Sequence, residues 1–345
     1  MKVSVAMVTY NHEKFIAKAL DSVLLQKTNF EYEIVIGEDC STDTTRNIVT
    51  EYKRRYPDKI RLLLNEKNMG MHGNGAQVLQ ACSGEYIAML DGDDYWTSAG
   101  KLQKQVNFLD SHPECSACFH DALIIPEDGS EEPQHYRTQQ KELSTVEDLL
   151  VDNFIPTAAV MFRRGLIGAL PAWANSLKMG DWVLHILNAI QGPIGYIDET
   201  MSVYVVHRGG VWSMKTRQDH ALAMIELFEA LDRHLPSQYR HSTARILRWR
   251  YAEASAGYEQ SGDLKSSGSC AVKAFVQQVK IVCEPLFSWK YRDSSSLPAV
   301  ITSVSGDRLF KNLLRLYLLP VMRRLFPLPF YKWLGTIARK LDVGL

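Results

Sequence analysis

The stretch Tyr86-Ile87-Ala88-Met89-Leu90-Asp91-Gly92-Asp93-Asp94 decides how this chain of 345 residues is interpreted. Its first five residues are apolar and indicate a buried strand. Three carboxylates then follow within four residues. Carboxylates packed so closely repel one another unless a positive charge joins them, and hard divalent cations such as Mg²⁺ and Mn²⁺ prefer oxygen ligands. A solvated acidic turn is the alternative.

The segments around this stretch alternate between strand and helix patterns. We predict strands at 3–9, 32–37, 60–64, 85–90 and 116–125, and helices at 12–25, 44–56, 73–82 and 100–111. Such alternation predicts a parallel sheet with right-handed crossovers. Further along, the pattern indicates a surface loop at 126–140, a helix at 145–151, a strand at 158–163, a helix at 182–189 and one or two strands at 195–206.

The pattern changes after residue 211. Residues 216–283 have a helical pattern throughout, with Ser261-Gly262-Asp263 as a turn between two helices. We therefore expect two parts, an α/β domain at 1–215 and a helical extension at 216–345.

The composition excludes some classes of protein. The 39 basic and 39 acidic residues balance, whereas a nucleic-acid binder has a basic excess, so we expect no nucleic-acid partner. Cys115 and Cys118 would face opposite sides of a strand, which argues against a disulfide or a shared metal there. Scattered cysteines predict reduced thiols and a cytoplasmic setting. We expect neither a signal peptide nor a segment of the ~18 apolar residues that could span a bilayer.

Polar clusters follow three of the predicted strands. The first ends in Thr9-Tyr10-Asn11, the second in Glu38-Asp39-Cys40, and the fourth in the acidic stretch. Because the carboxyl ends of parallel strands meet at one edge of a sheet, these clusters converge on one crevice. No glycine-rich phosphate loop follows the first strand, which argues against a dinucleotide-binding dehydrogenase or a P-loop enzyme.

These clusters, with Asn68-Met69-Gly70, Asn74-Gly75 and Ser83–Ile87, occur in an order that resembles glycosyltransferase family 2 of the bacterial cell-surface polysaccharide type. The resemblance covers about residues 1–215. It implies a GT-A fold, a Rossmann-like mixed α/β sheet flanked by helices, here with an all-helical C-terminal extension. It also implies transfer of a sugar from a nucleotide donor, UDP-linked, to a glycan or lipid-linked acceptor by a single displacement with inversion.

The resemblance also assigns roles to residues. Asp39 would accept a hydrogen bond from a uracil-like N–H, although an acid in the first turn of a helix is the alternative. Asp94 is either a partner of the other acids or a turn residue. The family usually has Gly where this chain has Cys40. The implied donor contacts are Thr9, Tyr10, Asn11, Asp39, Asn68, Gly70, Asp91, Gly92 and Arg208. The implied ligands of Mn²⁺ or Mg²⁺ are Asp93, Asp91 and His207, the last of which has a surface histidine as its alternative.

An inverting transfer also needs a general base for the acceptor hydroxyl. The resemblance assigns this role to Asp181, which could instead cap the helix at 182–189. The family often has Glu-Asp here, whereas this chain has Gly180-Asp181, so one acid is missing. Trp182 and Trp212 are candidate acceptor contacts, with packing as the alternative role.

The C-terminal segment is strongly basic. Residues 308–345 carry eight Lys or Arg and one acid, interleaved with aromatic and aliphatic residues. Such segments suit an anionic membrane, so we expect a location at the inner face of the cell membrane. A helix packed on the protein or on a partner subunit is the alternative.

One alternative function comes from another class, a non-catalytic module that binds a nucleotide-sugar or a glycan. Another, a nucleotidyltransferase, would need a phosphate-gripping loop after the first strand, and the residues there do not supply one.

Overall fold

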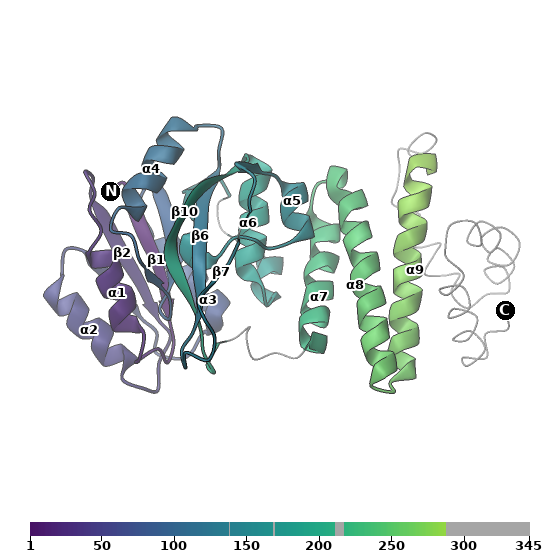
Figure 1. The fold of residues 1–345 in the computed structure, drawn as a ribbon, viewed down its shortest axis with the longest axis horizontal. Helices are drawn as coiled ribbons and strands as arrows, with labels where there is room; N and C mark the ends of the chain where they lie inside the picture. Colours follow the sequence, from purple (N-terminus) through teal and green to yellow (C-terminus); the bar gives the residue numbers. More distant parts are fainter. Residues whose placement is uncertain (138, 168–169, 211–216, 288–345) are drawn as a thin grey trace, which may run out of the picture. The chain divides into compact units, whose positions relative to one another are not determined.

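The computed structural model describes the chain except for residues 138, 168–169, 211–216 and 288–345. Strands and helices alternate in its first part (Figure 1): β1 Val3–Thr9, α1 Ile16–Leu24, β2 Tyr32–Glu38, α2 Thr45–Arg55, β3 Ile60–Leu64, α3 Gly70–Ala81, β4 Tyr86–Asp91, β5 Tyr95–Trp96 and α4 Lys101–Ser111. The middle part contains β6 Ala117–Pro126, β7 Gln134–His135, β8 Leu143–Ser144, α5 Val146–Val151, the 3-10 turns Thr157–Ala159 and Ala172–Ser176, β9 Met161–Arg163, α6 Gly180–Gln191 and β10 Ile194–Val206.

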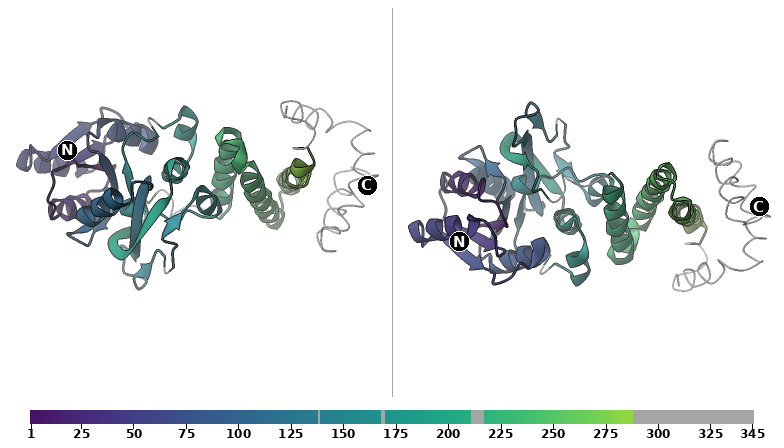
Figure 2. Two further views of the ribbon diagram at one scale, coloured as in Figure 1. Left: turned by 90° about the horizontal axis from the view of Figure 1, so that it is seen from above. Right: turned by 90° about the horizontal axis from the view of Figure 1, so that it is seen from below.

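One mixed sheet organises these strands in the order β3-β2-β1-β4-β9-β6-β10-β5. The four N-terminal strands are mutually parallel, and β9 lies antiparallel between β4 and β6. Figure 2 shows helices flanking this sheet. The predicted α/β class and the mixed sheet are therefore confirmed, and the parallel half holds β1, β2 and β4 side by side.

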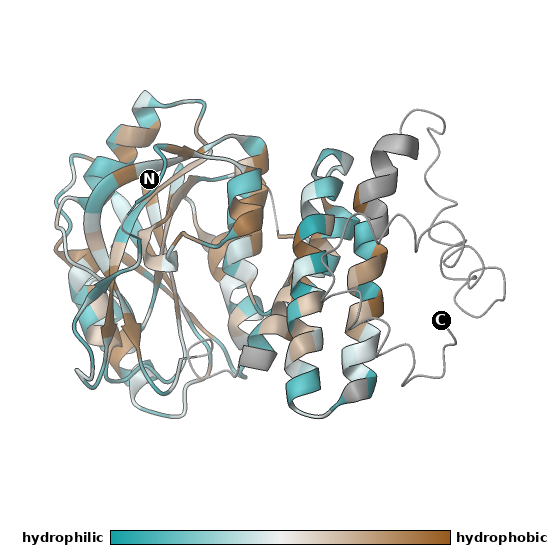
Figure 3. Ribbon diagram, turned by 45° about the vertical axis from the view of Figure 1, so that its right-hand side comes forward, coloured by the Kyte–Doolittle hydropathy of each residue, from teal (hydrophilic) through white to brown (hydrophobic). Residues whose placement is uncertain are grey.

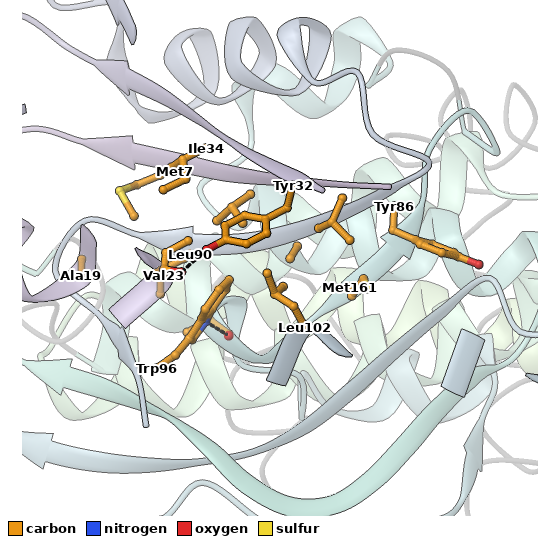
Figure 4. Packing of buried hydrophobic residues seen from close by; sticks show 14 of the residues in the cluster. Met7, Ala19, Val23, Tyr32, Ile34, Tyr86, Leu90, Trp96, Leu102 and Met161 are labelled. Atoms are coloured by element: carbon orange, nitrogen blue, oxygen red, sulfur yellow. Dashed lines mark hydrogen bonds between the residues drawn. The ribbon is translucent and has the colours of Figure 1, made fainter. Parts of the chain in front are cut away.

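The main hydrophobic core lies on one face of the parallel half. Residues Val3, Val5 and Met7 of β1 alternate toward it and are fully buried, as expected for a strand with a period of two. Two polar groups in this core are satisfied by backbone carbonyls (Figure 4). The Tyr32 hydroxyl donates to Val23, and the Trp96 indole N–H donates to Ala158, each at 2.9 Å.

Helix α3 packs on the opposite face, where the backbone of β2 comes close to it. A Cβ on Gly37 would overlap Asn74 and Val78 of α3, so only glycine fits at this point. The Asn74 amide donates to the Gly37 carbonyl at 2.9 Å. This close approach sets the position of α3 and of the loop before it, next to the carboxyl end of β2.

The predicted elements agree with the described ones, with differences at their ends. The strand expected at 158–163 is a 3-10 turn followed by the short β9, and the loop expected at 126–140 contains β7. The region expected to hold one or two strands, 195–206, is a single strand, β10, with two shifts of register against β6. These differences arise from pairing with strands that are distant in sequence, which a local sequence pattern cannot indicate.

The chain divides into two compact units at 246/247, whereas we expected a boundary near 215. Helix α7, Arg217–His234, belongs to the first unit. Its Phe228 ring packs edge-on against Trp182 of α6, with 5.7 Å between ring centroids. Buried contacts of this kind place α7 with the α/β domain although its local pattern resembles that of the later helices.

The described residues after α7 are helical, as expected. They form a 3-10 turn at Ser237–Tyr239, α8 Arg240–Gln260 and α9 Leu264–Phe287, with the predicted turn at 261–263. Hydrophobic and hydrophilic residues alternate along these helices (Figure 3). Within the described residues, no helix has the length and apolar character needed to cross a membrane. The basic segment 308–345 lies outside the described residues.

Candidate active site

The carboxyl ends of β1, β2 and β4 come together at one edge of the sheet, as the sequence predicted. Thr9 is level with Glu38, and Val8 is level with Asp91. The backbone continues this register beyond the strands: the Asp39 N–H donates to the Thr9 carbonyl at 3.0 Å, and the Gly92 N–H donates to the Val8 carbonyl at 2.9 Å. Thr9, Asp39 and the acidic turn therefore line one crevice.

The Asp39 carboxylate is held by two hydrogen bonds. It is only 2% exposed, and its Oδ1 accepts from the Asn65 amide at 2.9 Å and from the Met69 N–H at 2.8 Å. The second bond ties the Asn68–Gly70 loop to the end of β2. Within that loop, the Asn68 side chain accepts from the Gly70 N–H at 2.9 Å, and Gly70 has a left-handed φ of +75°.

Two non-glycine residues near Asp39 also adopt left-handed backbone angles. Asn11 has φ +55° and Cys40 has φ +60°. Asparagine tolerates left-handed backbone angles, but glycine is the residue most often found there. The left-handed angle of this turn explains why the family usually has glycine at position 40. In this chain Cys40 adopts the same angle. The Asn11 Oδ1 accepts from the Thr42 N–H at 2.8 Å, and Tyr10 is 40% exposed beside it.

The three acids of the turn after β4 have different surroundings. Asp93 Oδ2 lies 2.9 Å from His207 Nε2 and 3.7 Å from His12 Nε2. Asp94 is buried, and its Oδ1 accepts from the Val205 N–H at 2.9 Å. Asp94 is therefore a structural residue that joins the turn to β10. Gly92, between Asp91 and Asp93, has no room for a side chain, because a Cβ would lie 2.7 Å from Thr9 Oγ1.

These surroundings move the pKa values apart. Burial, together with the charges of Asp93 and Asp181, raises the pKa of Asp91 to about 8. Burial acts in the same direction on Asp93, but the hydrogen bond from His207 and the charge of His12 outweigh it and hold that pKa below its ordinary value. The hydrogen bond to Asp93 raises the pKa of His207. Asp93 is thus the acid that stays ionised most readily.

This cluster is chemically suited to a divalent cation. Two sets of side chains, His12 with Asp93 and His207, and Asp91 with Asp93 and Asp94, each bring their potential ligand atoms within 4.8 Å of one another. Carboxylate and imidazole ligands suit Mn²⁺, and carboxylates suit Mg²⁺. The set therefore fits such an ion. The sequence did not predict His12, whose only local signal is its position directly after the first strand.

Asp181 lies within electrostatic reach of the acidic turn. It is half-buried in the first turn of α6, and no side chain caps that helix, which begins at Gly180. Its charge contributes to the raised pKa of Asp91. Its Oδ2 accepts a hydrogen bond of 3.3 Å from Asn153, whose own Oδ1 is buried without a partner among the described residues. No local pattern in the sequence points to Asn153.

The remaining predicted residues are less close to these groups. Trp182 is 3% exposed, and its indole N–H donates to the Leu149 carbonyl at 2.7 Å, so it is a packing residue and not an acceptor contact. Arg208 is exposed, and its charge adds to the hydrogen bonds from Ser130 that chiefly lower the pKa of Asp128. Trp212 lies outside the described residues.

Comparison with known proteins is consistent with this arrangement. Residues 4–168 match the family model described as "Glycosyl transferase family 2". An uncharacterized protein of Mycobacterium tuberculosis is 41% identical over 213 residues, which are 61% of this chain and 60% of that protein. The putative teichuronic acid biosynthesis glycosyltransferase TuaG of Bacillus subtilis is 31% identical over 189 residues, 52% of this chain and 73% of TuaG. The chain thus spans about 60% of the length of its mycobacterial relatives.

Solved structures share the fold. TarS 1–349 of S. aureus in complex with UDP has a TM-score of 0.59 at 20% identity, covering 85% of this chain and 93% of that one. The mannosyltransferase PcManGT of Pyrobaculum calidifontis in complex with GDP-Man and Mn²⁺ has a TM-score of 0.53 at 18% identity, covering 98% and 84%.

Proposed function

The chain belongs to glycosyltransferase family 2, and on that premise we propose that it transfers a sugar from a UDP-linked donor to a glycan or lipid-linked acceptor, with inversion, in a single displacement. One observation supports the proposal: Asp39 and the acidic turn with its histidines lie at the same edge of the sheet, and Asp181 is near enough for its charge to act on Asp91. A nucleotide site, a cation site and a base are the parts that such a transfer requires.

The nucleotide belongs at the ends of β1 and β2. We assign its base to Asp39, which the Asn65 and Met69 hydrogen bonds hold in one orientation. Thr9 Oγ1 is buried and has no partner among the described residues, so it is available to a donor hydroxyl. Tyr10, Asn11, Asn68 and Gly70 form the rim of this site. The complexes of TarS with UDP and UDP-GlcNAc support UDP as the nucleotide.

A divalent cation would be held by Asp93 and Asp91 with His207, and His12 adds a further imidazole to that set. When bound, Mn²⁺ or Mg²⁺ supplies positive charge that stabilises the departing diphosphate. The complex of PcManGT with Mn²⁺ supports this choice of ion. Arg208, exposed next to His207, would pair with a phosphate, as arginine does in many anion sites.

The acceptor hydroxyl would lose its proton to Asp181. Asn153 donates to one oxygen of this carboxylate at 3.3 Å, which leaves the other oxygen for the acceptor.

A screen of donors tests the proposal. The wild-type chain would be incubated with Mn²⁺ and, separately, UDP-glucose, UDP-galactose, UDP-N-acetylglucosamine or GDP-mannose, and release of the nucleoside diphosphate would be measured. We expect slow hydrolysis of at least one UDP-sugar, which is lost on chelation of the metal. Binding of a UDP-sugar without any turnover, even with lipid-linked glycan acceptors, would favour the non-catalytic module instead.

We also propose that the basic segment 308–345 holds the chain at the anionic, cytoplasmic face of the membrane, because it has eight basic residues against one acid. Co-sedimentation with vesicles containing phosphatidylglycerol measures this. Binding should fall as salt rises and should be absent from vesicles of neutral lipid. Equal binding of a chain ending at 307 would contradict it.

A further inference from the structure

His72 lies where the nucleotide side and the base side of the crevice meet. It belongs to the first turn of α3, two residues after Gly70, and the same loop reaches Asp39 through the Met69 N–H at 2.8 Å. Its imidazole lies against the start of α6, since a Cβ on Gly180 would be 2.9 Å from the ring atoms Cε1 and Nδ1. The next residue is Asp181.

The His72 ring explains why residue 180 is a glycine. Gly180 is not among the glycines with a left-handed φ, so its backbone angles do not require glycine. Helix formation favours alanine over glycine by up to about 1 kcal/mol. A side chain at 180 would meet the imidazole, because a new Cβ would lie 2.9 Å from the ring and the ring would have to move. The small residue at 180 and the ring at 72 therefore form a complementary pair.

The ring has hydrogen-bonding capacity that the protein does not use. His72 is half-buried, and neither ring nitrogen has a hydrogen-bonding partner in the described part of the chain. Burial lowers its pKa, and the charge of Asp181 only partly opposes this effect. A neutral imidazole donates from one nitrogen and accepts at the other, which matches a sugar hydroxyl.

We propose that His72 contacts the transferred sugar of the donor and helps to select it, with Gly180 leaving room for the ring beside Asp181. This inference rests on the proposed function. In a single displacement the acceptor attacks the anomeric carbon on the face opposite the leaving diphosphate, so the base and the nucleotide lie on opposite sides of the sugar. A side chain that adjoins both the nucleotide loop and the base therefore lies beside the sugar itself.

Five proteins test this assignment: the wild type, His72→Ala, His72→Gln, Gly180→Ala and the double variant that combines His72→Ala with Gly180→Ala. Calorimetry with Mn²⁺ would measure the affinities for UDP, UDP-glucose, UDP-galactose and UDP-N-acetylglucosamine. We expect His72→Ala to weaken binding of the preferred UDP-sugar about tenfold, as for a lost hydrogen bond, and to change UDP binding less than twofold. His72→Gln, which keeps a donor and an acceptor, should recover part of the loss.

The Gly180→Ala variant separates a role in sugar binding from a general loss of structure. Its new methyl group displaces the ring, so the single variant should lose UDP-sugar affinity as His72→Ala does. In the double variant the obstructing ring is absent, so adding Gly180→Ala to His72→Ala should cost nothing more.

Three results would overturn the inference while leaving the proposed function intact: unchanged UDP-sugar binding in His72→Ala, equal losses for UDP and UDP-sugars, or additive losses in the double variant. If the wild type neither binds nor turns over any of these UDP-sugars, the proposed function itself fails, and the inference fails with it.

Discussion

The two sides of the crevice are built differently. On the nucleotide side, Asp39 accepts two hydrogen bonds of 2.8 and 2.9 Å, and every group comes from the first part of the chain. On the base side, Asp181 accepts one bond of 3.3 Å from Asn153, whose Oδ1 is buried without a partner among the described residues. The protein thus holds the Asp39 carboxylate with two hydrogen bonds, whereas Asp181 has one longer bond, from a side chain that keeps an oxygen without a partner in the described residues.

The largest effect is expected from Asp181→Asn. An amide cannot take the acceptor proton, so turnover should fall by about a thousandfold, while the affinity for UDP stays within twofold because the nucleotide side is untouched. Steady-state kinetics and calorimetry measure the two quantities. Asp58→Asn, an exposed acid distant in sequence from these groups, is the matched control. Normal turnover in Asp181→Asn would show that Asp181 is not the base, and the comparison of the two sides would fail.

The next effect is expected from Asp39→Ala on the nucleotide side. Loss of this carboxylate should weaken UDP binding by about ten- to a hundredfold, the range for hydrogen bonds to a charged group. Turnover at saturating donor should change much less. Glu66→Gln, an exposed acid in the following loop, should bind UDP normally. A variant at Asp39 that binds UDP as the wild type does would show that the held carboxylate is a structural residue.

Asp94 belongs to the acidic turn after β4, but its hydrogen bond to Val205 gives it a structural role. Its variants should therefore change stability and not donor binding. Asp94→Ala leaves the buried Val205 N–H without its acceptor and should destabilise the fold by about 1–3 kcal/mol. Asp94→Asn keeps an acceptor oxygen and should stay close to the wild type. Urea unfolding of both variants measures the difference. Equal stability of the two would mean that this hydrogen bond contributes little.

The last effect concerns a buried amine outside the candidate site and acts on stability alone. Lys101 is fully buried over the Trp96 ring, donates to Gln105 at 2.7 Å, and has a pKa that burial lowers to about 7. Between this value and the ordinary value of 10.5 the unfolded chain binds the extra proton, so stability should rise with pH across that window.

The slope for one proton approaches about 1.4 kcal/mol per pH unit. Lys101→Met should remove this pH dependence and leave UDP-sugar turnover unchanged. Urea unfolding of both proteins at several pH values between 7 and 10 measures it. A Lys101→Met variant with the same pH dependence as the wild type would assign the effect to other groups.

The sequence predicted the nucleotide side better than the base side, for a physical reason. Thr9, Asp39 and Asp91 each follow a strand with a clear apolar pattern, and the parallel arrangement brings strand ends together. Nothing local places Asn153 or His72 beside Asp181, because these contacts depend on how distant segments pack. His12 was missed for the same reason: only the structure shows it 3.7 Å from Asp93.

Residue type alone also misleads on the base side. Trp182 follows Asp181 directly, and an aromatic residue beside a candidate base is a reasonable sugar contact. The helical geometry turns neighbouring side chains in different directions, and Trp182 packs into the core against Phe228. The sequence cannot distinguish these two directions without knowing what covers α6.

The bond between Asp94 and Val205 has a consequence for measurements of motion. It joins the acidic turn to the last residues of β10, two positions before His207, across 111 residues of sequence. An amide proton held in this way exchanges with solvent only when its bond opens. The exchange rate of the Val205 amide therefore reports how often β10 separates from the turn. A UDP-sugar whose cation joins His207 to Asp93 should lower that rate.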